Sequence, residues 1–372
     1  MDVIDLLSDL IRIPSVCGQE ATIAHFIADW LGKNKLPVEM FDVKPNRPNV
    51  LVRLKGEEPG PCVLLNGHMD TVETGHNWVH DPFGAEVEEG RMYGRGALDM
   101  KGGLSCILWT AAALRREGLP RRGELLVTAV VDEEAISRGT YALIQRNLTK
   151  GMDFAMIPEP TNLKVVTAHR GRAVFDVRVR GKPAHSMRPE DGVNAIEMAA
   201  VLIQALRRIQ SPRHPKIGAA TVNTLKIEGG QEEVMLVPDQ CRIVIDRCLV
   251  PGYTVDAALA DLRRLINEID IDAEASLAVR ETPLSEPFEI SDDDPHVRLV
   301  MEAASGILEK PAEIGFHDGP CDSCLLVSQG GIPTIEFGPA GPGLHQPDEY
   351  VELDSVKKTA AVYHSVLSRI FA

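Results

Sequence analysis

The stretch ELLVTAVVDEE, residues 124–134, joins an apolar run rich in β-branched residues to three consecutive carboxylates. A short apolar run bounded by charged residues predicts a buried strand. Two like charges about 4 Å apart repel by about 4 kcal/mol at an effective dielectric of about 20, so Asp132, Glu133 and Glu134 are costly to hold together away from water. The three carboxylates therefore mark either a solvated strand end or a place where a cation collects them.

Three other apolar runs bounded by turn residues predict further buried strands. They are CVLLNG (62–67), DFAMIP (153–158) and IPTIEFG (332–338). Helical patterns separate the runs, as at residues 103–117 and 355–370. Continuous apolar strands that alternate with helices are typical of an α/β domain with a mostly parallel sheet.

The middle of the chain follows a different pattern, because polar and apolar residues alternate there as in half-exposed antiparallel strands. The alternating stretches are AVFDVRVRG (173–181), TVNTLKIEG (221–229), QCRIVIDRC (240–248) and ASLAVRE (275–281). Helical segments at 192–210 and 254–269 interleave with them. The resulting order β-α-β-β-α-β is the ferredoxin-like pattern.

These two patterns predict two domains, which suits a chain of 372 residues. The α/β domain is expected to consist of residues 1–169 and 283–372, and its two parts would complete one sheet. A smaller α+β domain, residues 170–282, is expected to be inserted between them.

The composition excludes several classes of protein. A formal net charge of −15 makes nucleic acid a poor partner, since binding it depends on neutralising phosphates with Lys and Arg. No window approaches the roughly 20 apolar residues that a membrane span requires. The N-terminal stretch MDVIDLLSDLIRIPS is acidic and amphipathic, unlike a signal peptide.

The seven cysteines are an odd number scattered over a long chain, which indicates reduced thiols and a cytoplasmic protein. Cys321 and Cys324 form a single CxxC. A structural zinc site would need a second such pair at short spacing, so we interpret these two residues as ordinary small side chains rather than as a metal or redox site.

Polar residues follow the predicted strands at the points where the strands end. The candidate site residues are His68, Asp70, Asp99, Glu133, Glu134, Glu159 and His345. Ligands of open parallel sheets bind at the carboxyl ends of the strands, and His with carboxylates from separate loops suits a hydrolytic zinc site with an open coordination position. Each residue alone has an ordinary explanation as a turn, cap or surface group, and only their common position favours a site.

Other catalytic motifs do not fit. The stretch GRGALD resembles the dinucleotide fingerprint G-x-G-x-x-G, but its sixth position is Asp99. The chain has no G-x-S-x-G, no Walker A motif and no H-E-x-x-H, which argues against serine hydrolases, P-loop proteins and thermolysin-like enzymes.

Six motifs in order resemble those of the co-catalytic zinc aminoacylase and exopeptidase family, and they span nearly the whole chain. They are GHMDTV, GRGALDMKGG, VVDEE, PEPT, GKPAHSMRPEDGVNAI and HQPDEYV. This family contains acetylornithine deacetylase, succinyl-diaminopimelate desuccinylase and glutamate carboxypeptidase. The resemblance implies a zinc-dependent exopeptidase-like catalytic domain with an inserted dimerisation or lid domain.

The resemblance also implies a role for each residue of the site. Asp99 would bridge two Zn²⁺ ions, with His68 and Glu159 on one ion and Glu134 and His345 on the other. Asp70 would hydrogen-bond the outer ring nitrogen of His68 and so fix its tautomer. Glu133 would be the general base that activates the metal-bridged water. Co²⁺ or Mn²⁺ are possible substitutes for zinc in such a carboxylate-rich site.

The implied reaction is hydrolysis of the amide bond of an N-acyl amino acid, as in acetylornithine deacetylase. A dipeptidase or a glutamate carboxypeptidase-type exopeptidase that cleaves short peptides is an alternative. A non-catalytic metal-containing binding protein is a second alternative, although neither the base nor a ligand is missing. A scaffold with only structural metal is disfavoured, because closed zinc sites use mainly Cys and His.

Two residues of the insert complete the expectation. The resemblance implies that His185 in GKPAHSM stabilises the oxyanion in the partner's active site, and therefore a homodimer through the inserted domain; the alternative is a loop histidine that caps the nearby segment. Arg247 is the candidate for binding the substrate carboxylate. Two departures from the family argue against assigning this role to Arg247. Met235 stands where relatives often have Asn, and Cys248 stands where the substrate-binding Arg is usual.

Overall fold

The computed structural model describes residues 2–231, 235–269, 274–279 and 285–372. The chain forms two compact units. The first unit consists of Met1–Thr167, Ile290–His317 and Cys321–Ala372, and the second of Ala168–Glu289 with Asp318–Pro320. The expected end of the insert, between residues 282 and 283, lies outside the described residues, as do the last two residues of the strand expected at 275–281.

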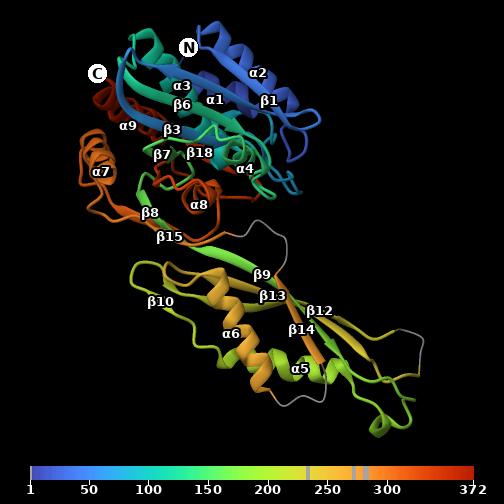
Figure 1. The fold of residues 1–372 in the computed structure, drawn as a ribbon. Coiled ribbons are helices and arrows are strands. Elements are labelled where there is room, and N and C mark those ends of the chain that lie inside the picture. The colour runs from blue at the N-terminus through green and yellow to red at the C-terminus, as the bar shows by residue number, and fades with distance from the viewer. Residues whose placement is uncertain (1, 232–234, 270–273, 280–284) are drawn as a thin grey trace. The chain divides into compact units, whose positions relative to one another are not determined.

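The first unit is built around a mixed sheet with the strand order β1-β2-β6-β3-β7-β17-β8 (Figure 1). Its strands are β1 (Val38–Lys44), β2 (Arg47–Lys55), β3 (Glu58–His68), β6 (Arg122–Val130), β7 (Phe154–Ile157), β8 (Val165–His169) and β17 (Thr334–Glu336). The central strands β6, β3, β7 and β17 are mutually parallel. Antiparallel strands flank them on both sides. The prediction of an α/β fold with a mostly parallel central sheet is therefore confirmed.

Helices cover both faces of this sheet, which explains why its strands are continuously apolar. Successive residues of a strand point to opposite faces, so Val63 and Leu65 join one core cluster while Leu64 joins another. The first face packs against α1 (Val3–Ile11), α2 (Ala21–Lys33), α3 (Gly102–Arg116), α7 (Pro295–Leu308) and α9 (Leu353–Phe371). The second packs against α4 (Arg138–Gln145) and α8 (Asp322–Ser328).

A small antiparallel sheet packs against α1, α3 and α9 and leads into the loop that carries Asp99. It consists of β4 (Glu86–Glu88), β5 (Arg91–Tyr93) and β18 (Tyr350–Glu352). A short helical turn at Ala97–Lys101 follows β5 and leads directly into α3. Periodicity did not predict these short strands. They bring residues near 93 and 350 side by side, since Tyr93 pairs with Tyr350.

The second unit is an antiparallel sheet packed on two helices (Figure 1). Its main elements are β9 (Gly171–Arg180), α5 (Ala195–Ala205), β12 (Thr221–Gly229), β13 (Gln240–Leu249), α6 (Val255–Glu268) and β14 (Glu274–Val279). The strand order β12-β13-β9-β14 places the first and third strands of the motif in the middle. This is the predicted ferredoxin-like arrangement.

Smaller elements complete the description. In the second unit they are β10 (Arg213–His214), β11 (Gly218–Ala219) and β15 (Phe288–Glu289), and β15 pairs with Ala168 and His169, which belong to the same unit. In the first unit β16 (Ile314–His317) pairs with β8.

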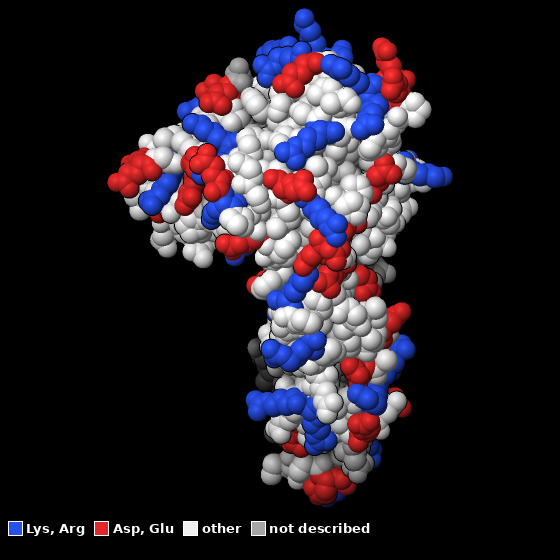
Figure 2. Space-filling view, turned by 90° about the vertical axis from the view of Figure 1, so that its left-hand side faces the viewer, with Lys and Arg blue, Asp and Glu red and all other residues white. Residues whose placement is uncertain are grey.

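The face shown in Figure 2 carries acidic and basic side chains interspersed with one another. Within the described ranges, the helices are too short or too polar to cross a bilayer.

Candidate metal centre

The four central parallel strands of the first unit end at the same edge of the sheet, and the predicted site residues follow those ends. His68 is the last residue of β3, and Glu133 and Glu134 come just after β6. Glu159 comes two residues after β7, and His345 lies in the loop that follows β17. Neighbouring parallel strands thus deliver the ligand-type side chains to one place, as expected for an open α/β sheet.

Asp99 lies between the two histidines of this group. Its Oδ1 is 3.1 Å from Nε2 of His68, and its Oδ2 is 3.1 Å from Nε2 of His345. Glu134 approaches the second histidine, with its Oε2 3.1 Å from Nε2 of His345. Each carboxylate oxygen of Asp99 therefore faces a different histidine, an arrangement that suits a bridging ligand.

The remaining carboxylates surround His68. Its Nε2 lies 3.8 Å from Oε1 of Glu159 and 3.9 Å from Oε2 of Glu133. His68 and Glu159 are buried, whereas the His345 side chain is 46% exposed. The group is thus enclosed on the His68 side and open to solvent at His345.

Asp70 makes contacts that differ from the expected ones. The outer ring nitrogen of His68, Nδ1, lies 2.9 Å from the backbone carbonyl oxygen of Asp70 and 3.8 Å from its carboxylate. The carboxylate instead accepts hydrogen bonds from the backbone N–H groups of Glu133 at 3.1 Å and Glu134 at 3.0 Å. The backbone of Asp70 therefore orients His68, and its side chain holds the two glutamates.

Asp132, the first carboxylate of the run, is buried and takes part in an ion-pair network. Its Oδ1 lies 2.6 Å from Nη2 of Arg47, and its Oδ2 lies 2.7 Å from Nη1 of Arg138. Its backbone adopts φ of +72°, and its carbonyl accepts the N–H of Ser137 at 2.7 Å. Glu20 also pairs with Arg47. Asp132 therefore anchors the turn that carries Glu133 and Glu134.

The electrostatics of the group fit bound cations. Burial raises the pKa of Glu133 and of Glu159 well above their ordinary values, and neighbouring carboxylates add to both shifts. Burial lowers the pKa of His68, but the hydrogen bond to Asp99 and nearby carboxylates outweigh it, so the net pKa is raised. Carboxylates buried together are costly to keep ionised without compensating positive charge, and ligand atoms of His68, Asp99 and Glu134 all lie within 4.8 Å of one another. Imidazole and carboxylate donors of this kind suit zinc and related divalent ions.

Two buried acids that the sequence analysis missed support the site. Oε1 of Glu349 accepts the backbone N–H groups of Leu98 at 2.9 Å and Asp99 at 3.1 Å, while Oε2 lies 2.5 Å from Arg95. Asp322 accepts hydrogen bonds from Asn66 and Thr140, and its charge raises the pKa of Glu133.

A sequence signal existed for Glu349 alone. It lies four residues after His345 within HQPDEYV, one of the six motifs. Asp322 has no comparable motif around it, since its partners come from β3 and α4.

The predicted site residues of the second unit have different surroundings. His185 is exposed, and its Nδ1 accepts the backbone N–H of Met187 at 3.2 Å. Arg247 on β13 is fully buried and donates to the hydroxyl of Tyr253 at 2.6 Å. That hydroxyl donates to Asp261 at 2.5 Å. Arg247 is thus enclosed within the core of its own unit and offers no exposed guanidinium to a substrate carboxylate.

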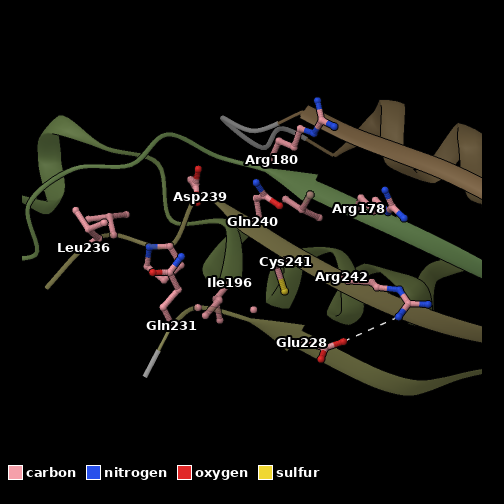
Figure 3. A pocket seen from close by; sticks show the side chains of 15 residues that line it. Arg178, Arg180, Ile196, Glu228, Gln231, Leu236, Asp239, Gln240, Cys241 and Arg242 are labelled. Carbon is pink, nitrogen blue, oxygen red and sulfur yellow. Dashed lines mark ion pairs between the residues drawn. The ribbon is translucent and has the colours of Figure 1, made fainter. Parts of the chain in front are cut away.

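The second unit also contains a pocket of about 810 Å³ beside the ends of β9, β12 and β13 (Figure 3). Charged side chains of both signs line it, including Arg178, Arg242, Glu228 and Asp239. Figure 3 shows Glu228 and Arg242 as an ion pair, at 3.9 Å. None of the predicted site residues lines this pocket.

Comparison with known proteins identifies the family of the chain. Residues 64–369 match the model of peptidase family M20/M25/M40. A succinyl-diaminopimelate desuccinylase of Methylobacterium nodulans is 31% identical over 98% of this chain and 95% of its own length. The corresponding protein of Methylobacterium radiotolerans is 29% identical over 98% and 96%.

Solved structures show the same fold. Aminopeptidase PepT from Bacillus cereus superposes with a TM-score of 0.81 at 20% identity, covering 99% of this chain and 98% of that one. The YXEP protein of Bacillus subtilis, described as a dinuclear metal binding peptidase, has a TM-score of 0.78 at 18% identity and covers 99% and 97%. Identities this low support the fold alone. The family match, which covers most of the chain, carries the assignment: this chain is a hydrolase of amide or peptide bonds that belongs to peptidase family M20/M25/M40.

Proposed function

We propose that the chain is a dimetal amidohydrolase that removes the acyl group of an N-acyl amino acid. The observation that carries this proposal is the placement of Asp99, whose two oxygens each lie 3.1 Å from a different histidine nitrogen. Asp99 would bridge two divalent ions, zinc in the first place, with Co²⁺ or Mn²⁺ as substitutes. The other proposed ligands are His68 and Glu159 for one ion and Glu134 and His345 for the other.

The proposed reaction divides the work among residues of the chain. Bound metal ions would polarise the substrate carbonyl and lower the pKa of water. Glu133 would accept the proton of the attacking water as the C–O bond forms, and would then pass it to the amine nitrogen as the C–N bond breaks. The N–H groups of Glu133 and Glu134 are fixed by Asp70, which supports the idea that the base is held in place. The products would be an amine and a carboxylate.

The substrate class is proposed from the curated relatives. The two desuccinylases match over nearly the whole of both chains, which favours deacylation and makes an N-succinyl amino acid the first substrate to test. The fold similarity to an aminopeptidase keeps exopeptidase activity as the second candidate. We further propose a cytoplasmic homodimer in which His185 stabilises the oxyanion in the partner's site.

Substitution of adjacent glutamates tests the assigned roles. Glu133→Gln is expected to keep both metals and to lose turnover by about 10²–10⁴-fold, the usual contribution of a general base. Glu134→Gln is expected to lose metal, as measured by metal analysis after dialysis. Glu313→Gln, at a surface residue paired with Lys164, is the matched control. Equal loss of metal in both site variants would contradict the proposed division of labour.

A turnover panel with metal-loaded protein tests the substrate class. N-succinyl, N-acetyl and longer N-acyl amino acids would be compared with dipeptides and folate-type glutamates. Cleavage of the acyl amino acids is expected. Cleavage of dipeptides alone would replace deacylation by the exopeptidase alternative.

A further inference from the structure

The first unit contains a second cluster of side chains of the types that can ligate a metal, formed by His317, Cys321 and Glu336. His317 is the last residue of β16, Cys321 immediately precedes α8, and Glu336 is the last residue of β17. In place of the interpretation of Cys321 as an ordinary side chain, which rested on the CxxC spacing alone, we propose that these three residues bind a further transition-metal ion of the zinc class, in addition to the ions of the centre around Asp99.

The geometry of the three side chains carries this proposal. Oε2 of Glu336 lies 3.1 Å from Nδ1 of His317, and Oε1 lies 2.8 Å from Sγ of Cys321. One ligand atom from each residue falls within 4.8 Å of the others. Tetrahedral zinc, with bonds of about 2.0 Å to nitrogen and about 2.3 Å to sulfur, places its ligand atoms roughly 3.3–3.8 Å apart. The hydrogen-bonded separations of 3.1 and 2.8 Å are shorter than these, so the three side chains, already gathered at one point, would move slightly apart as an ion enters between them.

The burial of the group agrees with a bound cation. Glu336 is fully buried and Cys321 is 7% exposed. A buried carboxylate is costly unless its charge is compensated, and a divalent ion compensates it together with a thiolate. The His317 side chain is 28% exposed, so an ion can reach the group from solvent.

The donor set also indicates which ion would bind. One imidazole, one thiolate and one carboxylate are all common zinc ligands, and sulfur disfavours magnesium and calcium. Binding would release the thiol proton of Cys321 to solvent, since cysteine binds metals as the thiolate. No electron transfer is involved.

A purely hydrogen-bonded cluster is the competing explanation. In that case Cys321 remains a neutral thiol that contacts Glu336 and the hydroxyl of Ser323, which is 2.8 Å away. The two explanations differ in an observable way, because only metal binding joins a metal ion to sulfur. The proposed ligands around Asp99 supply nitrogen and oxygen alone, so a metal–sulfur signal that disappears in Cys321→Ser reports this group and not that centre.

Cobalt substitution provides the test. Full-length protein would be freed of metal with a chelator and titrated with Co²⁺ alone, and thiolate-to-cobalt absorption in the near ultraviolet would be recorded. We expect this absorption in the wild type and in the control Cys324→Ser, which changes the other buried thiol of the same CxxC. In Cys321→Ser we expect the absorption to disappear and the chain to bind one equivalent of metal less than the wild type. Absence of the absorption from the wild type, or its persistence in Cys321→Ser, would overturn the proposal.

Two more variants keep the test independent of folding and of the proposed reaction. His317→Gln changes a partly exposed residue and is expected to weaken Co²⁺ binding at the sulfur-containing site at least tenfold, with far-ultraviolet circular dichroism unchanged. Asp99→Asn is expected to lose metal from the other centre and to keep the cobalt–sulfur absorption. Unchanged binding in His317→Gln, or loss of the absorption in a folded Asp99→Asn protein, would each contradict a separate site.

Discussion

The carboxylate of Asp70 accepts a hydrogen bond from the backbone N–H of Glu133 at 3.1 Å, although the two residues are 63 positions apart in the chain. The neighbouring N–H of Glu134 binds the other oxygen of the same carboxylate at 3.0 Å. Both interactions are buried or partly buried, so each is sensitive to the loss of its acceptor. Asp70 thus fixes the backbone from which the proposed base and a proposed metal ligand extend.

Replacement of Asp70 by Asn is predicted to lower kcat by about 10–100-fold, the usual effect of removing a group that supports a metal site. The amide presents an NH₂ group to one of the two backbone donors, so one hydrogen bond is lost. Steady-state kinetics with saturating metal would measure the effect. The control is Asp153→Asn, because Asp153 also accepts a backbone N–H, that of Cys62 at 2.7 Å, but precedes β7 at the opposite end of the strand. A similar loss in both variants would contradict a specific role for Asp70.

Replacement of Glu349 by Gln is predicted to destabilise the protein by about 3–5 kcal/mol, since it leaves Arg95 as an uncompensated buried charge. It would also weaken metal binding about 10–100-fold, because the carboxylate holds the N–H of Asp99 at 3.1 Å. Urea unfolding and metal titration would measure the two effects.

The control for Glu349 is an exposed ion pair. Asp354→Asn removes the partner of Lys358, which lies 2.6 Å away on α9, and exposed pairs contribute about 0–1 kcal/mol. Equal destabilisation by the two substitutions would show that the buried Arg95–Glu349 pair contributes no more to stability than an exposed ion pair.

The stability of the protein is predicted to depend on Lys101 between pH 7 and about 10. Lys101 is fully buried, and burial lowers its pKa to about 7, whereas an unfolded chain has a lysine pKa of about 10.4. The unfolded state therefore binds more protons in this range, and stability rises with pH by at most about 1.4 kcal/mol per unit. Below pH 7 both states are protonated and the cost of burying the charge is fully present.

Comparison with Lys101→Met isolates this contribution. Nζ of Lys101 donates to the carbonyl of Ile13 at 2.8 Å, so the variant loses one hydrogen bond at every pH. The difference in unfolding free energy between wild type and variant is expected to shift in favour of the wild type as pH rises from 7 to 10, at equal metal load. A constant difference across that range would show that Lys101 does not titrate there.

Mixing two inactive variants tests the proposed action of His185 across a dimer. Glu133→Gln and His185→Ala are each expected to be inactive as pure proteins. If His185 serves the partner's site, a mixed dimer regains one intact site, which combines Glu133 of one chain with His185 of the other. Turnover is therefore expected to reappear on mixing and subunit exchange. Failure to regain activity, with mixed dimers detected by mass spectrometry, would contradict a role for His185 in the partner's site.

Much of the fold was predictable because it depends on local periodicity. Continuous apolar runs such as CVLLNG and ELLVTAVV became the parallel strands β3 and β6, since a strand covered by helices on both faces needs apolar residues at every position. Alternation in the middle of the chain predicted the antiparallel sheet of the second unit. The short strands β5 and β18 escaped prediction because three residues are too few to establish a period.

The sequence by itself determined which side chains follow the ends of the parallel strands, and its ordered motifs indicated the family. The tertiary structure alone decided what those side chains contact. It placed each oxygen of Asp99 close to a different histidine. It also directed the carboxylate of Asp70 to backbone N–H groups and buried Arg247 beside Tyr253. The physical reason is that strand periodicity depends on neighbouring residues, whereas the contacts of Asp99 and Asp70 join atoms far apart in the chain, 246 positions between Asp99 and His345 and 63 between Asp70 and Glu133.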